Sequence, residues 1–206
     1  MGFRDRAEAA QKLVERLSAY RGHNPLVLGI PRGAVPMARL LAQALQGEVD
    51  VVLVRKLGAP GNPEFALGAV DESGWVYLAD YAEQYGGSPE YIGRERQAQL
   101  DTMRRRRARY TPVRAPIDPG GRIVIVVDDG LATGATMIAA LHALRARKPK
   151  RLICAVPVAP PDTLERIRPL ADEVICLESP PGFQAVGQFY SEFPQVEDAE
   201  VIAALK

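Results

Sequence analysis

The residues best suited to chemistry lie in one run, from Val127 to Thr136. Two adjacent carboxylates, Asp128 and Asp129, follow a strand-like run of valine and isoleucine, and Thr-Gly-Ala-Thr then opens a predicted helix. Free N–H groups at a helix start, together with threonine hydroxyls, bind a phosphate monoester. Ionised carboxylates only accept hydrogen bonds, so they suit a vicinal diol or a hydrated Mg²⁺. The pattern therefore points to ribose 5-phosphate, and its plain alternative is a strand end capped by aspartate.

A second candidate is the turn Gly29-Ile30-Pro31-Arg32-Gly33, which follows the first strand-like run. Glycine and proline let backbone amides converge on an anion. The Arg32 guanidinium can grip phosphate oxygens with two hydrogen bonds. We interpret the turn as a diphosphate-binding loop, and the alternative is an ordinary turn with a solvated arginine.

A third candidate is the pair Arg55 and Lys56, at the end of a predicted strand over residues 50–56. Two charges at the end of a buried strand are costly without a partner, and a phosphate would supply one. Alternatively, both side chains reach solvent past the edge of the sheet. Residues 58–63 are rich in glycine and proline and are predicted to be irregular. They form either a lid over the reaction or a plain surface loop.

Alternating strands and helices must position these loops. The predicted strands are continuous runs of valine, isoleucine and leucine, which is typical of strands buried on both faces of a parallel sheet. Strands are expected over 26–30, 50–56, 122–129, 152–158 and 173–178, and helices over 4–21, 34–46, 134–147 and 162–169. This alternation predicts an α/β fold with a doubly wound, mostly parallel sheet. Ligands of such sheets bind at the carboxyl ends of the strands, where loops 29–33, 56–63, 128–136 and 157–161 would meet.

The alternation is interrupted between residues 57 and 115. Residues 66–70 and 75–79 predict a hairpin, and Ser88-Pro89 begins a polar helix that runs to about Tyr110. We expect one domain over 1–206, with a flexible loop, hairpin and helical insertion at 57–115 and a C-terminal hood or tail at 178–206.

Composition narrows the class of protein. The chain has 206 residues, 47% of them hydrophobic and 25% charged, with a net charge of +1. These values exclude a disordered or membrane chain and give no reason to expect nucleic-acid binding. Cys154 and Cys176 lie in apolar runs and are predicted to be buried core residues. The first residues lack the apolar segment of a secretory signal, so we expect a reduced, cytoplasmic setting.

The run from Ile123 to Thr136 resembles the phosphoribosyl-pyrophosphate (PRPP) signature of type I phosphoribosyltransferases. The turn at 29–34 resembles the pyrophosphate loop of that family, which often contains a cis peptide bond outside proline. Val54-Arg55-Lys56 resembles the pair that precedes the family's catalytic loop. The resemblance covers roughly 25–70 and 120–160, and it is closest to a poorly characterised group called predicted phosphoribosyltransferases.

The resemblance implies Mg²⁺-dependent transfer of a 5-phosphoribosyl group from PRPP to a nitrogen acceptor such as a nucleobase, with release of pyrophosphate. It assigns PRPP binding to Pro31, Arg32, Gly33, Asp128, Asp129, Ala132, Thr133, Gly134, Ala135 and Thr136. It assigns catalysis to Arg32, Arg55, Lys56, Asp128 and Asp129, with the two aspartates holding Mg²⁺ indirectly through ribose or water. The alternative is a PRPP-sensing module without turnover that regulates a protein or RNA partner. We expect a homodimer that acts on PRPP and a small-molecule acceptor, without nucleic acid or membrane.

Two positions depart from better-known members of that family. Members that use 6-oxopurines have an aspartate where this chain has Ala132, and a methyl group cannot exchange a proton. This disfavours hypoxanthine, guanine and xanthine as acceptors. Gly130 replaces a bulky apolar residue, so we expect a looser turn after the acidic pair.

Two further features have no settled role. The aromatic residues Phe183, Phe189 and Tyr190 of the tail could stack on a planar acceptor, or they could pin the tail to the core. The basic block Met103–Arg109 could meet RNA phosphates, but a solvated helix face or a partner surface is the more common meaning of such a block.

Overall fold

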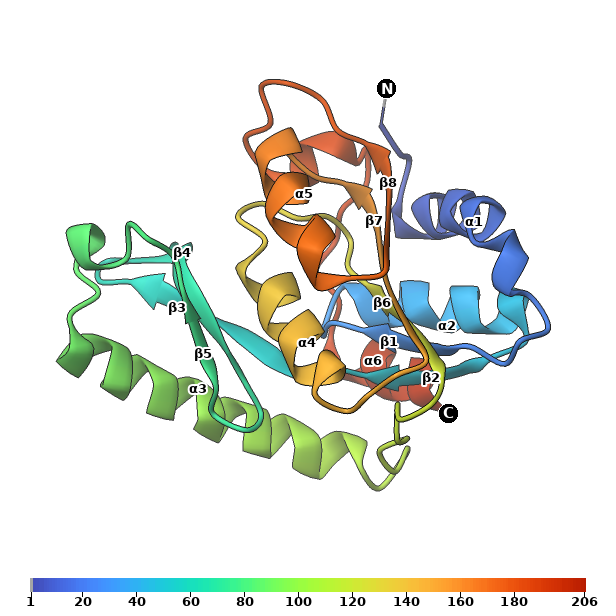
Figure 1. Ribbon diagram of the computed structural model, residues 1–206, viewed down its shortest axis with the longest axis horizontal. Helices are drawn as coiled ribbons and strands as arrows, with labels where there is room; N and C mark the ends of the chain where they lie inside the picture. The colour runs from blue at the N-terminus through green and yellow to red at the C-terminus, as the bar shows by residue number, and fades with distance from the viewer. Residues whose placement is uncertain (1) are drawn as a thin grey trace.

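A five-stranded parallel sheet forms the centre of the molecule in the computed structural model, which describes residues 2–206 (Figure 1). Its strands are β1 (Leu26–Gly29), β2 (Glu48–Val51), β6 (Ile123–Val127), β7 (Arg151–Val158) and β8 (Glu173–Glu178). They lie in the order β2-β1-β6-β7-β8, and each neighbouring pair is parallel. The predicted doubly wound, mostly parallel sheet is therefore confirmed.

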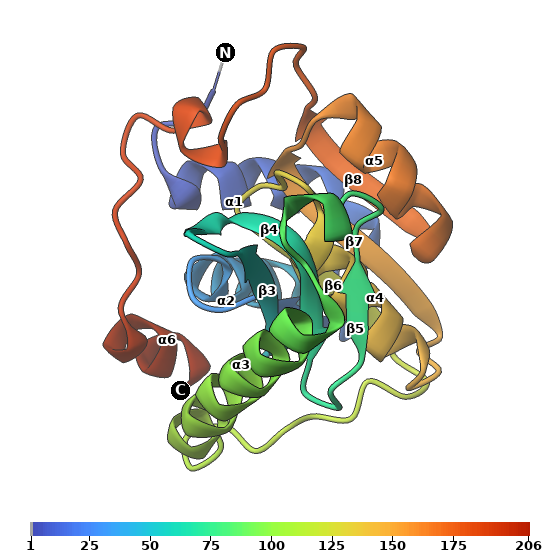
Figure 2. The same cartoon turned by 90° about the vertical axis from the view of Figure 1, so that its left-hand side faces the viewer.

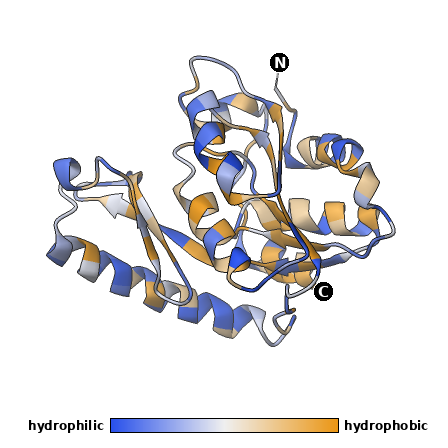
Figure 3. Ribbon diagram, in the orientation of Figure 1, coloured by the Kyte–Doolittle hydropathy of each residue, from blue (hydrophilic) through white to orange (hydrophobic). Residues whose placement is uncertain are grey.

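Helices cover both faces of this sheet. On one face, α1 (Arg6–Arg16) and α2 (Ala34–Leu45) pack on residues such as Val27 and Ile125. On the other face, α4 (Ala135–Arg145) and α5 (Pro161–Ile167) pack on residues such as Val126. Burial on both faces explains why the strands are continuous apolar runs, which Figure 3 shows in orange.

The insertion forms an arm beside the central sheet (Figure 1). The strands β3 (Val54–Ala59), β4 (Asn62–Asp71) and β5 (Val76–Leu78) make an antiparallel sheet, and α3 (Pro89–Tyr110) lies along it. Figure 2 faces this arm and shows α3 crossing the small sheet toward α6. The Ser88 hydroxyl accepts from the backbone N–H of Tyr91, so the predicted helix start at Ser88-Pro89 is confirmed, as is the second hairpin of the arm.

Two expectations for this region were wrong. Residues 50–56 are not one strand, because the chain leaves the parallel sheet after Val51 and Val54 begins the antiparallel sheet. Residues 58–63 are not irregular, because they form the end of the β3–β4 hairpin. The glycines make this pairing possible: Gly61 takes a φ of +73° in the turn, and a Cβ on Gly58 would meet the Pro63 backbone.

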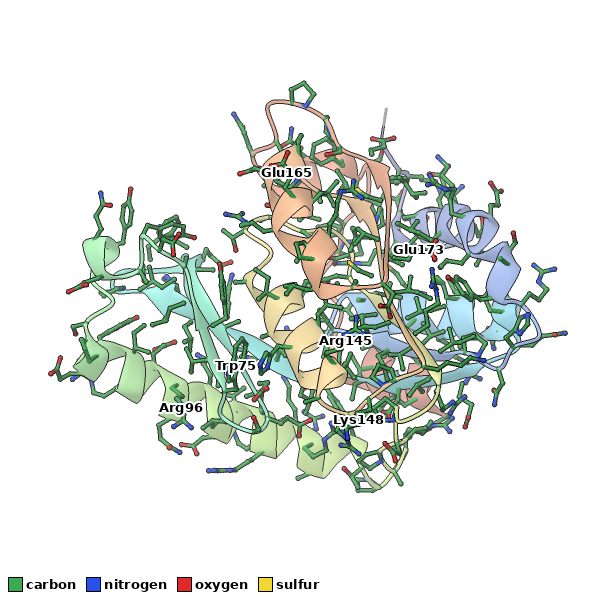
Figure 4. The ribbon with its side chains drawn as sticks, viewed as in Figure 1. Trp75, Arg96, Arg145, Lys148, Glu165 and Glu173 are labelled. Atoms are coloured by element: carbon green, nitrogen blue, oxygen red, sulfur yellow. The ribbon has the colours of Figure 1, made fainter. Side chains whose placement is uncertain are left out.

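The arm is fixed to the central domain by an aromatic contact. Trp75 from the arm hairpin points toward α4 (Figure 4). There it stacks on His142, with ring centroids 3.6 Å apart and planes within 7°. A separate apolar cluster joins α3, β3 and α2, and the fully buried Tyr110 lies in it. These two contacts therefore hold the arm in a fixed position against the central domain.

The tail returns to the N-terminal part of the chain. After β8, a short 3-10 helix η4 (Val186–Phe189) leads to Tyr190, which pairs with Phe3 in an isolated bridge. The chain ends in α6 (Asp198–Leu205), which packs against α2. Within residues 2–206, no helix has the length and apolar character needed to cross a membrane.

Candidate functional site

The acidic pair lies where β6 ends, at the carboxyl edge of the parallel sheet. Both aspartates are half-buried, and the backbone N–H of Asp129 donates to Asp128 Oδ1 over 2.9 Å. Burial raises the pKa of Asp128 well above its ordinary value, and the adjacent charge of Asp129 raises it further. Burial also raises the pKa of Asp129, while the Arg6 guanidinium opposes this rise. Burial of these two negative charges therefore destabilises the free protein, and a cationic or hydrogen-bond-donating ligand would offset this cost.

The predicted phosphate loop, residues 132–136, runs into the start of α4, which begins at Ala135. Gly134 has a φ of +81°, which a residue with a side chain rarely adopts, and it precedes the first helical turn. Two residues of α5 brace the loop from behind. Thr163 Oγ1 donates to the Ala132 carbonyl over 2.7 Å, and Arg166 Nη2 donates to the Thr133 carbonyl over 3.1 Å. Sequence reasoning missed both braces.

The predicted diphosphate loop follows β1 and lies beside the acidic pair. The peptide bond between Pro31 and Arg32 is cis, as the family resemblance led us to expect. A Cβ on Gly33 would collide with Asp129 Oδ2, so only glycine allows this approach. The loop backbone and the acidic pair therefore form two adjoining walls of one site.

Arg55 and Lys56 lie near the beginning of β3, and not at the end of a parallel strand as predicted. Arg55 Nε donates to Gln99 Oε1 of α3 over 2.8 Å, and Lys56 Nζ forms an ion pair with Glu64 over 2.6 Å. Burial lowers the pKa of Arg55, and the positive charges of Arg106 and Arg32 lower it further. These effects indicate a concentration of positive charge on this side of the site.

Arg106 is a third residue whose place at the site sequence reasoning missed. It is half-buried, and no carboxylate within residues 2–206 forms an ion pair with Arg32, Arg55 or Arg106. The spacing of residues along α3 could have indicated this position. Arg106 follows Gln99 by seven residues, or two helical turns, and therefore shares the α3 face that packs on β3.

Three predicted segments meet at one cavity of about 270 Å³, lined by Ile30, Pro31, Gly33, Val54, Arg55, Lys56, Asp128, Asp129 and Thr136. A second cavity of about 130 Å³ lies along the phosphate loop, and Lys56 and Thr136 line both. Its lining includes Ala132, Thr133, Gly134 and Ala135. Arg32 does not line either cavity, although its charge reaches Arg55. A continuous surface thus joins the phosphate loop and the two carboxylates to a basic edge, by which we mean the cations Arg32, Arg55, Lys56 and Arg106.

The tail aromatics lie beside this surface. Tyr190 is buried, stacks on Phe193 with centroids 4.8 Å apart, and donates its hydroxyl to the Asp129 carbonyl over 2.7 Å. Phe183 and Phe189 stack on each other with centroids 5.1 Å apart. These contacts favour the alternative that the aromatics pin the tail to the core. An acceptor-binding role for the three residues stays a prediction.

The predicted looser turn at Gly130 is instead tightly covered by the tail. Gly130 is buried, and a Cβ at this position would lie 2.6 Å from Val186 Cγ1. The missing side chain therefore makes room for the tail to pack directly behind the acidic pair.

The remaining reactive groups lie away from the site. Cys154 is fully buried as predicted, whereas Cys176 is half-buried, and burial raises the pKa of both thiols. Within the described residues, no cluster of three or more His, Cys, Asp or Glu side chains could hold a metal ion. Any metal at Asp128 and Asp129 would therefore take most of its ligands from a substrate and from water.

Comparison with known proteins identifies the family to which this chain is related. A family model described as "Phosphoribosyl transferase domain" matches residues 2–193. The crystal structure of TT1426 from Thermus thermophilus is similar, with 49% sequence identity and a TM-score of 0.82, and the match covers 100% of this chain and 98% of that chain.

Two curated relatives come from Mycobacterium tuberculosis, strains CDC 1551 and H37Rv, and each bears the name "Putative phosphoribosyl transferase". Both are 43% identical to this chain over 207 residues, and the match covers 98% of this chain. The chain spans only 46% of the length of these relatives.

Proposed function

The chain belongs to the phosphoribosyl transferase domain family, and from this premise we propose that it transfers the 5-phosphoribosyl group of PRPP to a nitrogen acceptor. In this reaction the bond from ribose carbon 1 to pyrophosphate breaks, and a bond from carbon 1 to the acceptor nitrogen forms. Pyrophosphate leaves with the bonding electron pair, and the acceptor nitrogen loses a proton.

One observation carries the proposal. Three segments far apart in the sequence, at 30–33, 54–56 and 128–136, meet around one cavity and its extension. Each segment offers a different group: backbone amides, cationic side chains, or carboxylates beside a helix start. PRPP needs all three, because it has a diphosphate, a diol and a 5-phosphate.

Each part of PRPP has a partner in the proposed complex. The 5-phosphate binds the free N–H groups and hydroxyls of residues 132–136 at the start of α4. The ribose diol donates to Asp128 and Asp129. The diphosphate lies against the 31–33 backbone, with Arg32, Arg55 and Lys56 as cations. These cations stabilise the charge that develops on the departing pyrophosphate, which is the main source of catalysis in this proposal.

The residues present fit Mg²⁺. Two half-buried carboxylates with raised pKa values would be relieved by a cation, and oxygen ligands suit this ion. Asp128 and Asp129 would hold it through ribose hydroxyls or water, as the absence of a larger ligand cluster in residues 2–206 requires. When bound, the ion would neutralise charge on the diphosphate. Asp128 and Asp129 orient the diol, while Lys56 lies at the junction of the two cavities.

Position 132 restricts the class of acceptor. Ala132 is exposed at the phosphate loop and has no group that could take a proton. We therefore consider 6-oxopurines less suitable acceptors than other nitrogen compounds. No residue at the cavity selects one base or amine.

The test is turnover. Purified protein with PRPP and Mg²⁺ is offered a panel of nucleobases and amines, and pyrophosphate release is measured with and without each acceptor. The proposal expects release that depends on one acceptor class and yields its ribosyl 5-phosphate derivative. PRPP binding without release for any acceptor would contradict the enzyme and favour the sensing module instead.

A further inference from the structure

Arg6 of α1 joins the acidic pair to the C-terminal tail. Its Nε donates to Asp129 Oδ2 over 3.0 Å, and its Nη1 donates to the Pro194 carbonyl over 2.6 Å. The guanidinium carbon lies 4.0 Å from the centre of the Phe193 ring, in a cation–π contact. One side chain thus contacts two parts of the chain that are far apart in sequence.

The position of Arg6 on its helix is unusual for a charged residue. The residues three, four and seven places later are Ala9, Ala10 and Leu13, and all three are fully buried. Arg6 therefore lies on the core-facing side of α1, where an apolar side chain is expected. A charge at such a position needs a specific partner, and Asp129 is that partner.

Burial keeps water away from this ion pair. The Arg6 side chain is 14% exposed and the Asp129 side chain 16% exposed, so water screens the pair only weakly. Removal of one member would leave the other charge without its partner in a poorly solvated place. The pair therefore restricts the carboxylate far more than an exposed surface pair would.

The geometry leaves Asp129 able to bind a ligand. Arg6 reaches Oδ2 through Nε alone, and this same oxygen faces the Gly33 backbone. No side-chain N–H group of the described residues donates to Oδ1. Tyr190 holds the other end of the residue through its hydrogen bond to the Asp129 carbonyl. The carboxylate is thus fixed at Oδ2 and at its backbone, and Oδ1 is left for a ligand.

We propose that Arg6 is a positioning residue for the ribose subsite: it fixes the Asp129 carboxylate toward the ribose diol and makes that orientation depend on the docked tail at Phe193 and Pro194. This inference rests on the proposed function, because it assigns the diol to Asp129. It adds α1 and the tail, which do not line the cavity, to the parts that determine PRPP affinity.

The experiment compares Arg6→Gln with Arg4→Gln. Arg4 is the matched control, because its side chain is 67% exposed and, within residues 2–206, forms an ion pair with Asp5 alone, so the same charge is lost two residues away. Three probes are titrated with Mg²⁺ into each protein: PRPP, ribose 5-phosphate and inorganic pyrophosphate. Thermal unfolding is recorded for each variant.

Arg6→Gln should weaken the binding of PRPP and ribose 5-phosphate by about tenfold, the usual weight of one charge-assisted contact. Pyrophosphate should lose less affinity, because it has no diol. Arg4→Gln should bind all three probes as the unaltered protein does. Arg6→Lys should recover part of the loss, since a lysine restores the charge but not the planar fork that reaches Asp129 and Pro194 together. Should Arg6→Gln not fold, the same comparison between probes is made on Arg6→Lys.

A double-mutant cycle separates positioning from tail packing. If Arg6 acts through Asp129, Arg6→Gln should cause no further loss of ribose 5-phosphate affinity in an Asp129→Asn background. Equal losses for all three probes, or full additivity in the cycle, would overturn the inference. So would unchanged ribose 5-phosphate binding by Arg6→Gln when the unaltered protein binds. If the unaltered protein binds no probe, the proposed function fails, and this inference fails with it.

Discussion

Replacing Asp128 by asparagine should weaken PRPP binding and at the same time stabilise the free protein. Asparagine has nearly the same shape, and its side-chain oxygen can still accept the hydrogen bond from the Asp129 N–H, which measures 2.9 Å. The substitution removes one of two adjacent charges at the carboxyl end of β6. It therefore tests charge, with little change in packing.

The expected loss of affinity follows from the contact that is removed. A hydrogen bond to a charged group contributes about 1.5–3 kcal/mol, so PRPP should bind about 10- to 150-fold more weakly. The expected gain in stability follows from the raised pKa of Asp128, whose causes are burial and the charge of Asp129. If Asp128→Asn removes only about 1 kcal/mol of this unfavourable burial and repulsion, the Tm of a domain of this size should rise by about 2–4 °C.

The gain in stability should depend on pH with a definite sign. The pKa of Asp128 is higher in the folded protein than its ordinary value of 3.8. Between these two pKa values, the folded state therefore holds a proton that the unfolded state has lost. The stability of the unaltered protein therefore falls as pH rises from about 3.8 through the raised pKa. Asp128→Asn should be more stable than the unaltered protein at pH values above the raised pKa, and this difference in stability should disappear below pH 3.8.

The assay is a calorimetric titration of PRPP with Mg²⁺, together with thermal unfolding of the free protein at several pH values. Asp80→Asn is the control, because Asp80 is exposed and makes no ion pair within the described residues. Unchanged PRPP affinity in Asp128→Asn would refute the assignment of the diol to this carboxylate. A lower Tm at neutral pH would refute the argument that the buried pair destabilises the free protein.

Three further predictions concern the basic edge and the tail. Arg32→Ala and Arg55→Ala should each lower kcat by about 100-fold or more, and should weaken PRPP binding less, since they act where charge develops; steady-state kinetics with a working acceptor measures both. Arg106→Gln should weaken the binding of inorganic pyrophosphate in a titration, whereas Arg105→Gln, which alters an exposed residue of the same helix, should not. Gly130→Ala should destabilise the protein by about 1–3 kcal/mol in urea unfolding, because a Cβ would lie 2.6 Å from a tail side chain.

The parallel sheet and the phosphate loop could be predicted because their signals are local. A run such as Ile123–Val127 has the composition of a strand buried on both faces, and the acidic pair and threonines follow it without a gap. The start of α3 was equally clear, because Ser88 and Pro89 occupy the positions that those residues favour. In each case the deciding interactions lie within one or two turns of the residue.

The point where the chain enters the arm and the supports of the site could not be predicted in the same way. Residues 51–54 are uniformly apolar, so nothing in the sequence marks the place where the chain leaves one sheet for another. Arg6 contacts Asp129 across 123 positions, and the Tyr190 hydrogen bond to Asp129 spans 61. The only local sign of the first contact was a charge on the apolar side of α1.

The most direct test of the account is a calorimetric titration of PRPP and Mg²⁺ into the unaltered protein and into a variant with both Asp128→Asn and Asp129→Asn. We predict one PRPP site per chain in the unaltered protein. We also predict an affinity at least about tenfold lower in the variant, with the fold retained by circular dichroism. No PRPP binding by the folded, unaltered protein would contradict the central claim, and equal affinity in the two proteins would show that the acidic pair serves the fold alone.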